Sequence, residues 1–207
     1  MSHWRSIVSS LLKQLASEDA VDRCDAVEAL GQYPRPSVLR ALHHVLLFDP
    51  SDLVRCTAAE QIGYAGNPSS LPFLLAALAD TSWLVRGWAA SAIGDIGMAQ
   101  YRTLNIKRIL EEVLCYENHA FVLLNVTYAL YQLGEKQYLP RIIAFLSHRS
   151  YRVRCAAANI LSEIIEDDNK WVIYTALRDA LAKEKTVAAQ DAFRKALSHC
   201  EQQEKHE

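Results

Sequence analysis

The fold is decided by two stretches of the same form, DPSDLVRCTAAEQIG at residues 49–63 and DTSWLVRGWAASAIG at residues 80–94. Each contains Val-Arg, an Ala three residues after the Arg, an Ile seven residues after it and a Gly eight residues after it. Apolar positions that lie three and four residues apart predict a helix rather than a strand. Because the pattern returns with the same spacing, the chain contains an internal repeat.

Three further copies are less regular. Counted along the chain, the two stretches above are the second and third copies. The first copy has Asp22 where Val is expected, the fourth has Val126 at the Arg position, and the fifth has Ser162 in place of Gly. We call the residue at the Arg position the anchor of its repeat and number the other positions from it. The predicted anchors are Arg23, Arg55, Arg86, Val126 and Arg154. They recur at intervals of 28–40 residues, which is typical of helical repeats.

A second pattern precedes three of the copies. Pro36, Pro72 and Pro140 each stand at the start of an apolar stretch with helical spacing. Proline suits the first turn of a helix because its missing N–H would lack a partner there. Each repeat is therefore predicted to be a first helix, a short polar turn and a second helix. The Gly at position +8 is predicted to end the second helix in a left-handed conformation.

Six helix pairs follow from these patterns. The predicted pairs are 4–16 with 20–31, 36–48 with 52–64, 70–79 with 83–94, 103–115 with 120–133, 138–147 with 151–165, and 170–182 with 186–199. Neighbouring pairs can bury one another's apolar faces, so we expect a single continuous solenoid domain over residues 1–199. The polar tail, residues 200–207, is expected to fray.

These residues resemble the HEAT-repeat family, and in particular the short bacterial HEAT repeats of phycobilisome lyase-like proteins. The resemblance rests on Asp49 and Asp80, each six residues before an anchor arginine, and extends over residues 4–199. It implies an all-α fold, a right-handed α-α superhelix of about six helix pairs. It also implies a ladder in which each arginine reaches a neighbouring turn. An exposed pair of this kind would contribute only ~0.2–1 kcal/mol.

The same resemblance places the second helices on a concave face. Positions −1, +3, +4 and +7 are mostly apolar and are expected to form the core. Positions +2, +5 and +9 lie opposite and hold acids and aromatic rings but no Lys or Arg. The predicted acidic, aromatic, partner-binding groove consists of Asp25, Glu28, Glu60, Tyr64, Trp83, Trp88, Asp95, Tyr128, Tyr131 and Glu135. The alternative is that these are ordinary solvated positions whose rings pack partly on neighbours.

The composition narrows the classes of partner. Lys and Arg number 22 and Asp and Glu number 24, which gives a net charge of −2. This balance disfavours binding to nucleic acid or to an anionic membrane, because such binders normally carry excess cations. No stretch is long and apolar enough to predict a membrane span. Five widely spaced cysteines without a C-x-x-C pair predict neither disulfides nor a zinc site, and we expect a cytoplasmic protein.

No arrangement of residues is typical of a catalytic site. The histidines do not form an H-E-x-x-H motif, and neither a P-loop nor G-x-S-x-G occurs. His206–Glu207, in the tail, is the only His-Glu pair, so the di-iron hydroxylase activity of some HEAT-repeat proteins is not expected. Cys24, Cys56 and Cys155 share position +1, which indicates small residues at a helix contact. We therefore expect no enzymatic activity, no cofactor and no metal.

The leading hypothesis is a non-catalytic protein-binding module whose groove takes a basic protein partner. Tyr and Trp are favoured interface anchors, and acids steer a basic partner toward the surface. Such a protein could be an immunity protein that neutralises a toxin domain, or an adaptor within a larger complex. Two alternatives stay open. One is a bilin lyase-like or chaperone-like factor, on the resemblance; the other is a HEAT-like DNA glycosylase, which an acidic groove disfavours because it repels phosphates.

Overall fold

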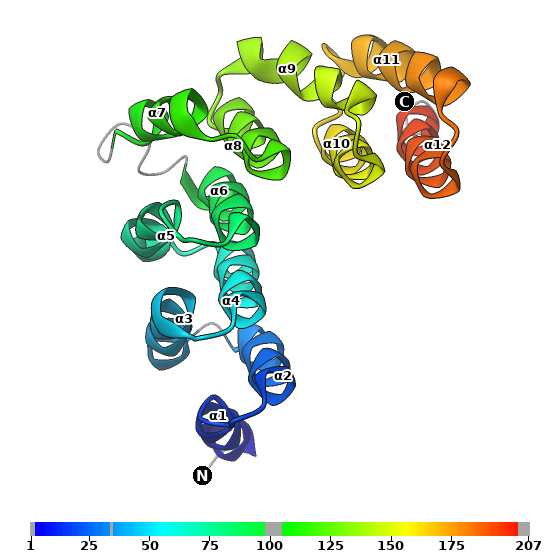
Figure 1. Cartoon of the computed structure of the whole chain (residues 1–207). Helices are drawn as coiled ribbons and strands as arrows, with labels where there is room; N and C mark the ends of the chain where they lie inside the picture. The colour runs from blue at the N-terminus through cyan, green and yellow to red at the C-terminus, as the bar shows by residue number, and fades with distance from the viewer. Residues whose placement is uncertain (1–2, 34, 98–104, 203–207) are drawn as a thin grey trace. The chain divides into compact units, whose positions relative to one another are not determined.

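The computed structural model describes residues 3–33, 35–97 and 105–202, and this part of the chain contains twelve α-helices and no strand (Figure 1). The first eight are α1 (His3–Gln14), α2 (Ala20–Gly31), α3 (Pro36–Phe48), α4 (Asp52–Ala65), α5 (Leu71–Ala77), α6 (Trp83–Gly97), α7 (Ile106–Tyr116) and α8 (Ala120–Gln132). The others are α9 (Leu139–Ala144), α10 (Tyr151–Glu163), α11 (Lys170–Lys183) and α12 (Val187–Gln202), with short 3-10 helices at η1 (Pro68–Ser70), η3 (Lys136–Tyr138) and η4 (Phe145–Ser147). The predicted all-α architecture of six helix pairs is confirmed.

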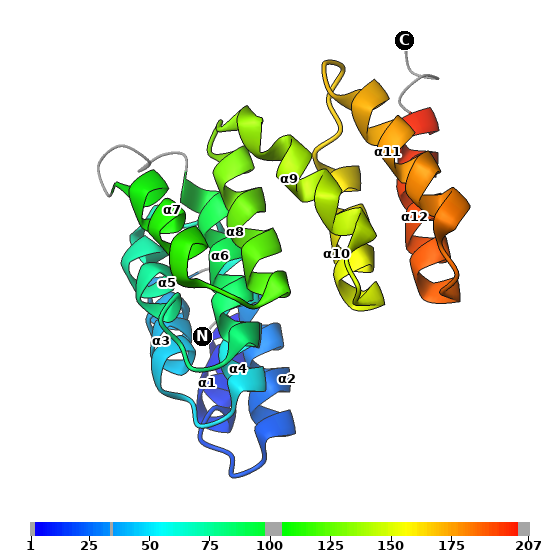
Figure 2. The same ribbon diagram turned by 45° about the horizontal axis from the view of Figure 1, so that its top comes forward.

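The chain divides into two compact units, Met1–Glu135 and Lys136–Glu207. In the first unit, α1, α3, α5 and α7 form one layer, and α2, α4, α6 and α8 form a second layer in which each helix packs on the next (Figure 1). In the second unit, α10 packs on α12, while α9 and α11 form the other layer (Figure 2). The single continuous domain over residues 1–199 stays a prediction.

The apolar positions predicted for the second-layer helices are the core, as expected. At positions +3 and +7, eight side chains are each 0% exposed: Ala26, Leu30, Ala58, Ile62, Ala89, Ile93, Ala157 and Leu161. Alanine at +3 lets neighbouring helices approach closely, and the larger side chain at +7 fills the space between them. Each buried Leu or Ile contributes about 1.5–3 kcal/mol relative to an exposed one.

At Gly63 and Gly94, the glycine at position +8 permits close helix contact and does not end the helix as predicted, whereas Gly31 is the last residue of α2 and Gly134 has the predicted left-handed conformation. Gly63 and Gly94 lie inside α4 and α6. A Cβ at Gly94 would stand 2.8 Å from the Cα of Ala129 in α8, and a Cβ at Gly63 would stand 3.0 Å from the Cβ of Ala92 in α6. The left-handed residue that follows α4 is instead Gly66, at position +11 with φ 61°.

The fourth repeat is shifted by three residues from its predicted register. Arg86 donates to Glu117 at 2.7 and 3.2 Å, and in the preceding repeats the acid contacted in this way stands six residues before an anchor. Six residues after Glu117 is Leu123, so Leu123 is the anchor and Val126 is not. The left-handed Gly134, with φ 94°, then stands at +11 like the glycine after α4. The corrected anchors recur at intervals of 31–37 residues.

The last helix continues past the predicted boundary at residue 199. Helix α12 ends at Gln202, and Cys200 is only 1% exposed. Burial of this side chain stabilises the final turn, so the prediction of a frayed tail from residue 200 is wrong for its first residues. Residues 203–207, the rest of the predicted tail, lie outside the described residues.

Candidate functional site

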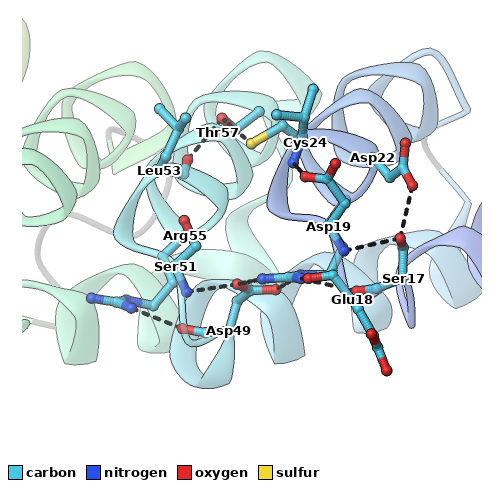
Figure 3. A network of polar contacts seen from close by, with 12 residues as sticks. Ser17, Glu18, Asp19, Asp22, Cys24, Asp49, Ser51, Leu53, Arg55 and Thr57 are labelled. Carbon is cyan, nitrogen blue, oxygen red and sulfur yellow. Dashed lines mark hydrogen bonds and ion pairs between the residues drawn. The ribbon is translucent and has the colours of Figure 1, made fainter.

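A ladder of arginines runs along the turns of the first unit, and Figure 3 shows the part of it around Asp49. Arg55 donates from Nε and Nη2 to Asp80 at 2.7 and 2.9 Å, and from Nη1 to the backbone carbonyl of Asp49 at 2.8 Å. Arg23 contacts the carboxylate of Asp49 in the same way, at 2.8 and 2.9 Å. Asp49 also accepts from the N–H of Ser51 at 2.9 Å, at the start of α4. Each arginine therefore joins its own turn to the next one.

Glutamates take the place of aspartate elsewhere in the ladder. Glu117 accepts from Arg86 in the first unit, and Glu184 accepts from Arg154 at 2.5 and 2.8 Å in the second. Gln190 stands at the last anchor and donates to the carbonyl of Glu184 at 2.8 Å. Neither glutamate was predicted from the sequence, because Glu117 lies nine residues before the predicted anchor Val126 and no anchor was predicted in the sixth repeat.

The ladder carboxylates are stably ionised. Burial alone would raise the pKa of Asp80 and of Glu117, but the hydrogen bonds from the arginines hold each pKa below its ordinary value. The hydrogen bonds from Arg154 lower the pKa of Glu184 to about 2. The side chains of Arg55 and Asp80 are each 12% exposed, so this is not the exposed pair assumed from the sequence. Carboxylates of this kind hold the repeats together and are poor proton donors at neutral pH.

Six of the predicted groove residues form a solvent-accessible set on the second layer, which we call the acidic stripe. The stripe consists of Asp25 and Glu28 on α2, Glu60 and Tyr64 on α4, and Trp88 and Asp95 on α6. Tyr64 is 73% exposed, and its hydroxyl donates to Glu60 at 3.1 Å. Glu60 and Trp88 are half-buried, and the other members are exposed. Positions +2, +5 and +9 of these three helices hold no Lys or Arg.

Asp95 lies where three second-layer helices meet. One of its oxygens accepts from Nε2 of Gln132 in α8 at 3.0 Å, and the other would stand 3.4 Å from a Cβ at Gly63 in α4. Loss of water around the carboxylate raises the pKa of Asp95, and the hydrogen bond from Gln132 offsets this only in part. Within the described residues, no Lys or Arg forms an ion pair with Asp95. It is therefore an acid that a cation from a partner would stabilise.

Tyr128 and Tyr131 are not part of the exposed surface, so the prediction that they line a groove is wrong. They are 6% and 3% exposed, respectively. Helix α8 is buried at every position from Leu124 to Tyr131, because it is apolar on all sides. In the corrected register, Tyr131 stands at position +8, where the other second-layer helices of this unit have glycine. The hydroxyl of Tyr128 accepts from Gln132 at 2.9 Å.

Trp83 and Glu135 also lie apart from the acidic stripe. Trp83 stacks on His119 with ring centroids 4.2 Å apart and meets the edge of Phe121 at 5.6 Å, at the turn end of α6. Glu135 lies beyond α8 because of the register shift, and its carboxylate pairs with Lys107 of α7 at 2.8 Å. Trp83 packs against the next repeat although it is 43% exposed, and Glu135 is paired with a cation, so their role in partner binding stays a prediction.

The described residues offer little for metal or covalent chemistry. They contain no group of three or more His, Cys, Asp or Glu side chains that could hold a metal ion. Burial raises the pKa of Cys56 to about 11, so its thiol stays protonated at neutral pH. In the same part of the chain, no helix combines the length and apolarity needed to cross a bilayer. What the acidic stripe can supply is a charged and aromatic surface for non-covalent contacts.

Stacked helix pairs joined by an arginine ladder define an α-solenoid, a repeat protein in which each unit contacts mainly its neighbours. Residues 8–94 match HEAT repeats, and residues 122–148 match the PBS lyase HEAT-like repeat. The chain belongs to the HEAT-repeat family.

Two solved structures illustrate the likeness in fold. One is the complex of CpcE and CpcF of phycocyanin lyase from Nostoc sp. PCC7120, with 18% identity, a TM-score of 0.52, and coverage of 93% of this chain and 94% of that chain. The other is a designed armadillo repeat protein, with 19% identity, a TM-score of 0.45, and coverage of 93% and 99%. No match was found among curated proteins. At these identities, the first likeness supports the solenoid fold and says nothing further about activity.

Proposed function

We propose that this HEAT-repeat protein is a non-catalytic, cytoplasmic binding module that takes a basic protein partner on its acidic stripe. The observation that carries the proposal is that α2, α4 and α6 each place a carboxylate at position +2, +5 or +9, on one side of the helix, and hold no Lys or Arg at these three positions. Acids that repeat along successive helices create a continuous negative potential, which attracts a basic surface and raises the rate of encounter.

The acids and the rings of the stripe have different roles in this proposal. Glu28 and Asp25 are exposed and steer the partner, so their effect falls as salt screens them. Tyr64 and Trp88 supply broad, rigid contact area, and rings of this kind dominate binding energy once water is excluded. Because Trp88 is already half-buried, it loses little freedom on binding.

A second candidate is a bilin lyase-like or chaperone-like factor that acts together with another protein chain. The match of residues 122–148 to the PBS lyase HEAT-like repeat favours it, as does the fold shared with CpcE and CpcF, which form a complex. These comparisons favour this candidate over the binding module, and they offer no support for a toxin-neutralising immunity protein. Both candidates require a protein partner and differ in whether a bilin is attached to it.

The test of the stripe uses three immobilised proteins in an extract of the native host. The first is the wild type, and the second carries Glu28→Lys, Glu60→Lys and Asp95→Lys. The third carries the same charge change on exposed acids elsewhere, Glu112→Lys, Asp179→Lys and Asp191→Lys. We expect a basic protein to be retained by the wild type and the control but not by the stripe variant. Retention of the same proteins by all three would place binding on another surface.

The two candidates are separated by a second measurement. The chain is co-expressed with a bilin-producing pathway and a phycobiliprotein subunit, and covalently attached bilin on the subunit is measured by absorbance and mass spectrometry. Attachment that depends on this chain supports the lyase-like candidate, and its absence supports the binding module. A DNA glycosylase role would instead require duplex DNA to bind at physiological salt, which an acidic surface opposes.

A further inference from the structure

A hollow of about 450 Å³ lies in the first unit beside α1 and α3, in the first helix layer. Most of its lining is apolar and comes from the residues just after α1, from α3 and from the turn that follows α3: Leu15, Ala16, Ala41, Val45, Phe48 and Pro50. We call it the outer hollow. Its volume lies within the range of ligand-binding cavities. Phe48 is 68% exposed, which is a large apolar surface to leave in water beside a hollow.

Two basic side chains of α1 and α3, Lys13 and Arg40, stand one helical turn before Ser17 and His44, which line the outer hollow. Helices α1 and α3 contain no Asp or Glu. Lys13, Arg40 and His44 are all exposed. The acid in the lining, Asp49, is neutralised by Arg23 at 2.8 Å. A ligand beside Lys13 and Arg40 therefore meets cations that have no acidic partner on their own helices.

Acidic residues near the turn between α1 and α2 would determine the direction in which a charged ligand binds in the outer hollow. Toward the turn between α1 and α2, Glu18 is exposed, and Asp22 accepts from the hydroxyl of Ser17 at 2.8 Å. These acids would repel a carboxylate, whereas Lys13 and Arg40 would attract one. A ligand with one apolar and one anionic part would therefore bind with its anionic part toward α1 and α3.

We propose that the outer hollow binds a segment of a partner protein in which one large apolar side chain is flanked by carboxylates. The apolar side chain fills the space between Leu15 and Val45, and the carboxylates meet Lys13 and Arg40. This site is separate from the acidic stripe and has the opposite charge preference, so it goes beyond the proposed function. It gives the chain two recognition surfaces, one in each layer of the first unit.

The test uses short synthetic peptides with the full chain. The probe is the acetylated and amidated peptide Glu-Glu-Phe-Glu-Glu, followed by chemical-shift changes in the backbone amides of the isotope-labelled protein. We expect changes at residues 15–17 and 41–48 and a binding constant that weakens with salt. Glu-Glu-Gly-Glu-Glu lacks the apolar side chain, and Lys-Lys-Phe-Lys-Lys reverses the charge. If the apolar hollow and the basic side chains both contribute to binding, each of these control peptides should bind roughly tenfold more weakly.

Variants connect the binding to the outer hollow. Arg40→Glu should weaken binding of the peptide Glu-Glu-Phe-Glu-Glu roughly tenfold. Arg108→Glu, the same charge reversal at an exposed side chain of α7, should leave this binding unchanged. Ala41→Trp should fill the space and abolish binding; if this variant does not fold, Ala41→Leu replaces it. Equal binding of all three peptides, or no effect of Arg40→Glu, would overturn the proposal.

The same variants would reveal whether the outer hollow binds a membrane surface or a second copy of the chain instead. Binding to phosphatidylglycerol vesicles that requires Arg40, without any response to the peptide, would identify a membrane surface instead. A concentration-dependent dimer that Arg40→Glu disrupts would identify a second copy of this chain. Either result would overturn the assignment of a carboxylate-bearing partner segment.

Discussion

Arg86 and Glu117 join α6 to the turn before α8 through hydrogen bonds of 2.7 and 3.2 Å. Nη1 of Arg86 also donates to the carbonyl of Asp80 at 2.9 Å, so one side chain links two successive turns. The carboxylate of Glu117 accepts from the N–H groups of Asn118 and His119, both at 2.8 Å. The pair therefore joins α6 to the next repeat and also holds the turn that leads into α8.

Removal of one ladder arginine should be costly. In Arg55→Ala, the carboxylate of Asp80 would stay mostly shielded from water without its charged partner. We expect the free energy of unfolding to fall by about 2–3 kcal/mol, more than for an exposed pair. Denaturant unfolding measures this. The control is Arg108→Ala, which removes an exposed pair with Glu112 and should cause no measurable loss. Equal losses in the two variants would contradict the structural role of the ladder.

The ladder should make stability depend on acid pH. Hydrogen bonds from Arg154 lower the pKa of Glu184 from 4.5 to about 2 in the folded chain. The unfolded chain therefore takes up this proton first, and the contribution of Glu184 is complete above pH 4.5 and lost as the pH falls toward 2. Glu184→Gln should be less stable at pH 7, with a flatter decline in melting temperature across this window. Glu166→Gln, a substitution at an exposed acid, should keep the wild-type profile.

Close packing predicts that adding one methyl group to α6 will destabilise the first unit. In Gly94→Ala, the new Cβ would stand 2.8 Å from the Cα of Ala129 and would displace the side chain of Gln132. We expect a loss of about 1–3 kcal/mol, although Ala favours helix over Gly. Thermal unfolding checks this against Ser91→Ala on the same helix. A more stable Gly94→Ala would mean that α6 and α8 are not in close contact.

Asp95 should favour binding at a cost in stability. Because its pKa is raised in the folded chain, the folded state holds this proton more tightly, and stability falls as the pH rises through its titration. Asp95→Asn should therefore be as stable as the wild type or more stable at pH 7, while it binds a basic partner more weakly. Melting temperatures and affinities are compared with those of Asp25→Asn, which alters an exposed acid. A clear loss of stability in Asp95→Asn would contradict a net destabilising effect of the ionised carboxylate.

The repeat, the helix pairs and the core could all be predicted from local sequence patterns. Ala58 and Ile62 recur as Ala89 and Ile93 at the same distance from an anchor arginine, and all four are fully buried. This information is local, because the apolar side of an amphipathic helix follows from 3.6 residues per turn. The acids of the stripe could be placed on the opposite side of the helix for the same reason.

Tertiary structure alone decided the register of α8 and the exposure of its side chains. Val126 reproduced the expected spacing to Ala129 because a shift of three residues stays on nearly the same side of a helix. The partner of Arg86 distinguishes the two registers, and that contact joins residues far apart in the chain. Burial of Tyr128 and Tyr131 likewise depends on what covers α8. Periodicity defines the sides of a helix, but only neighbouring elements determine which sides they exclude from water.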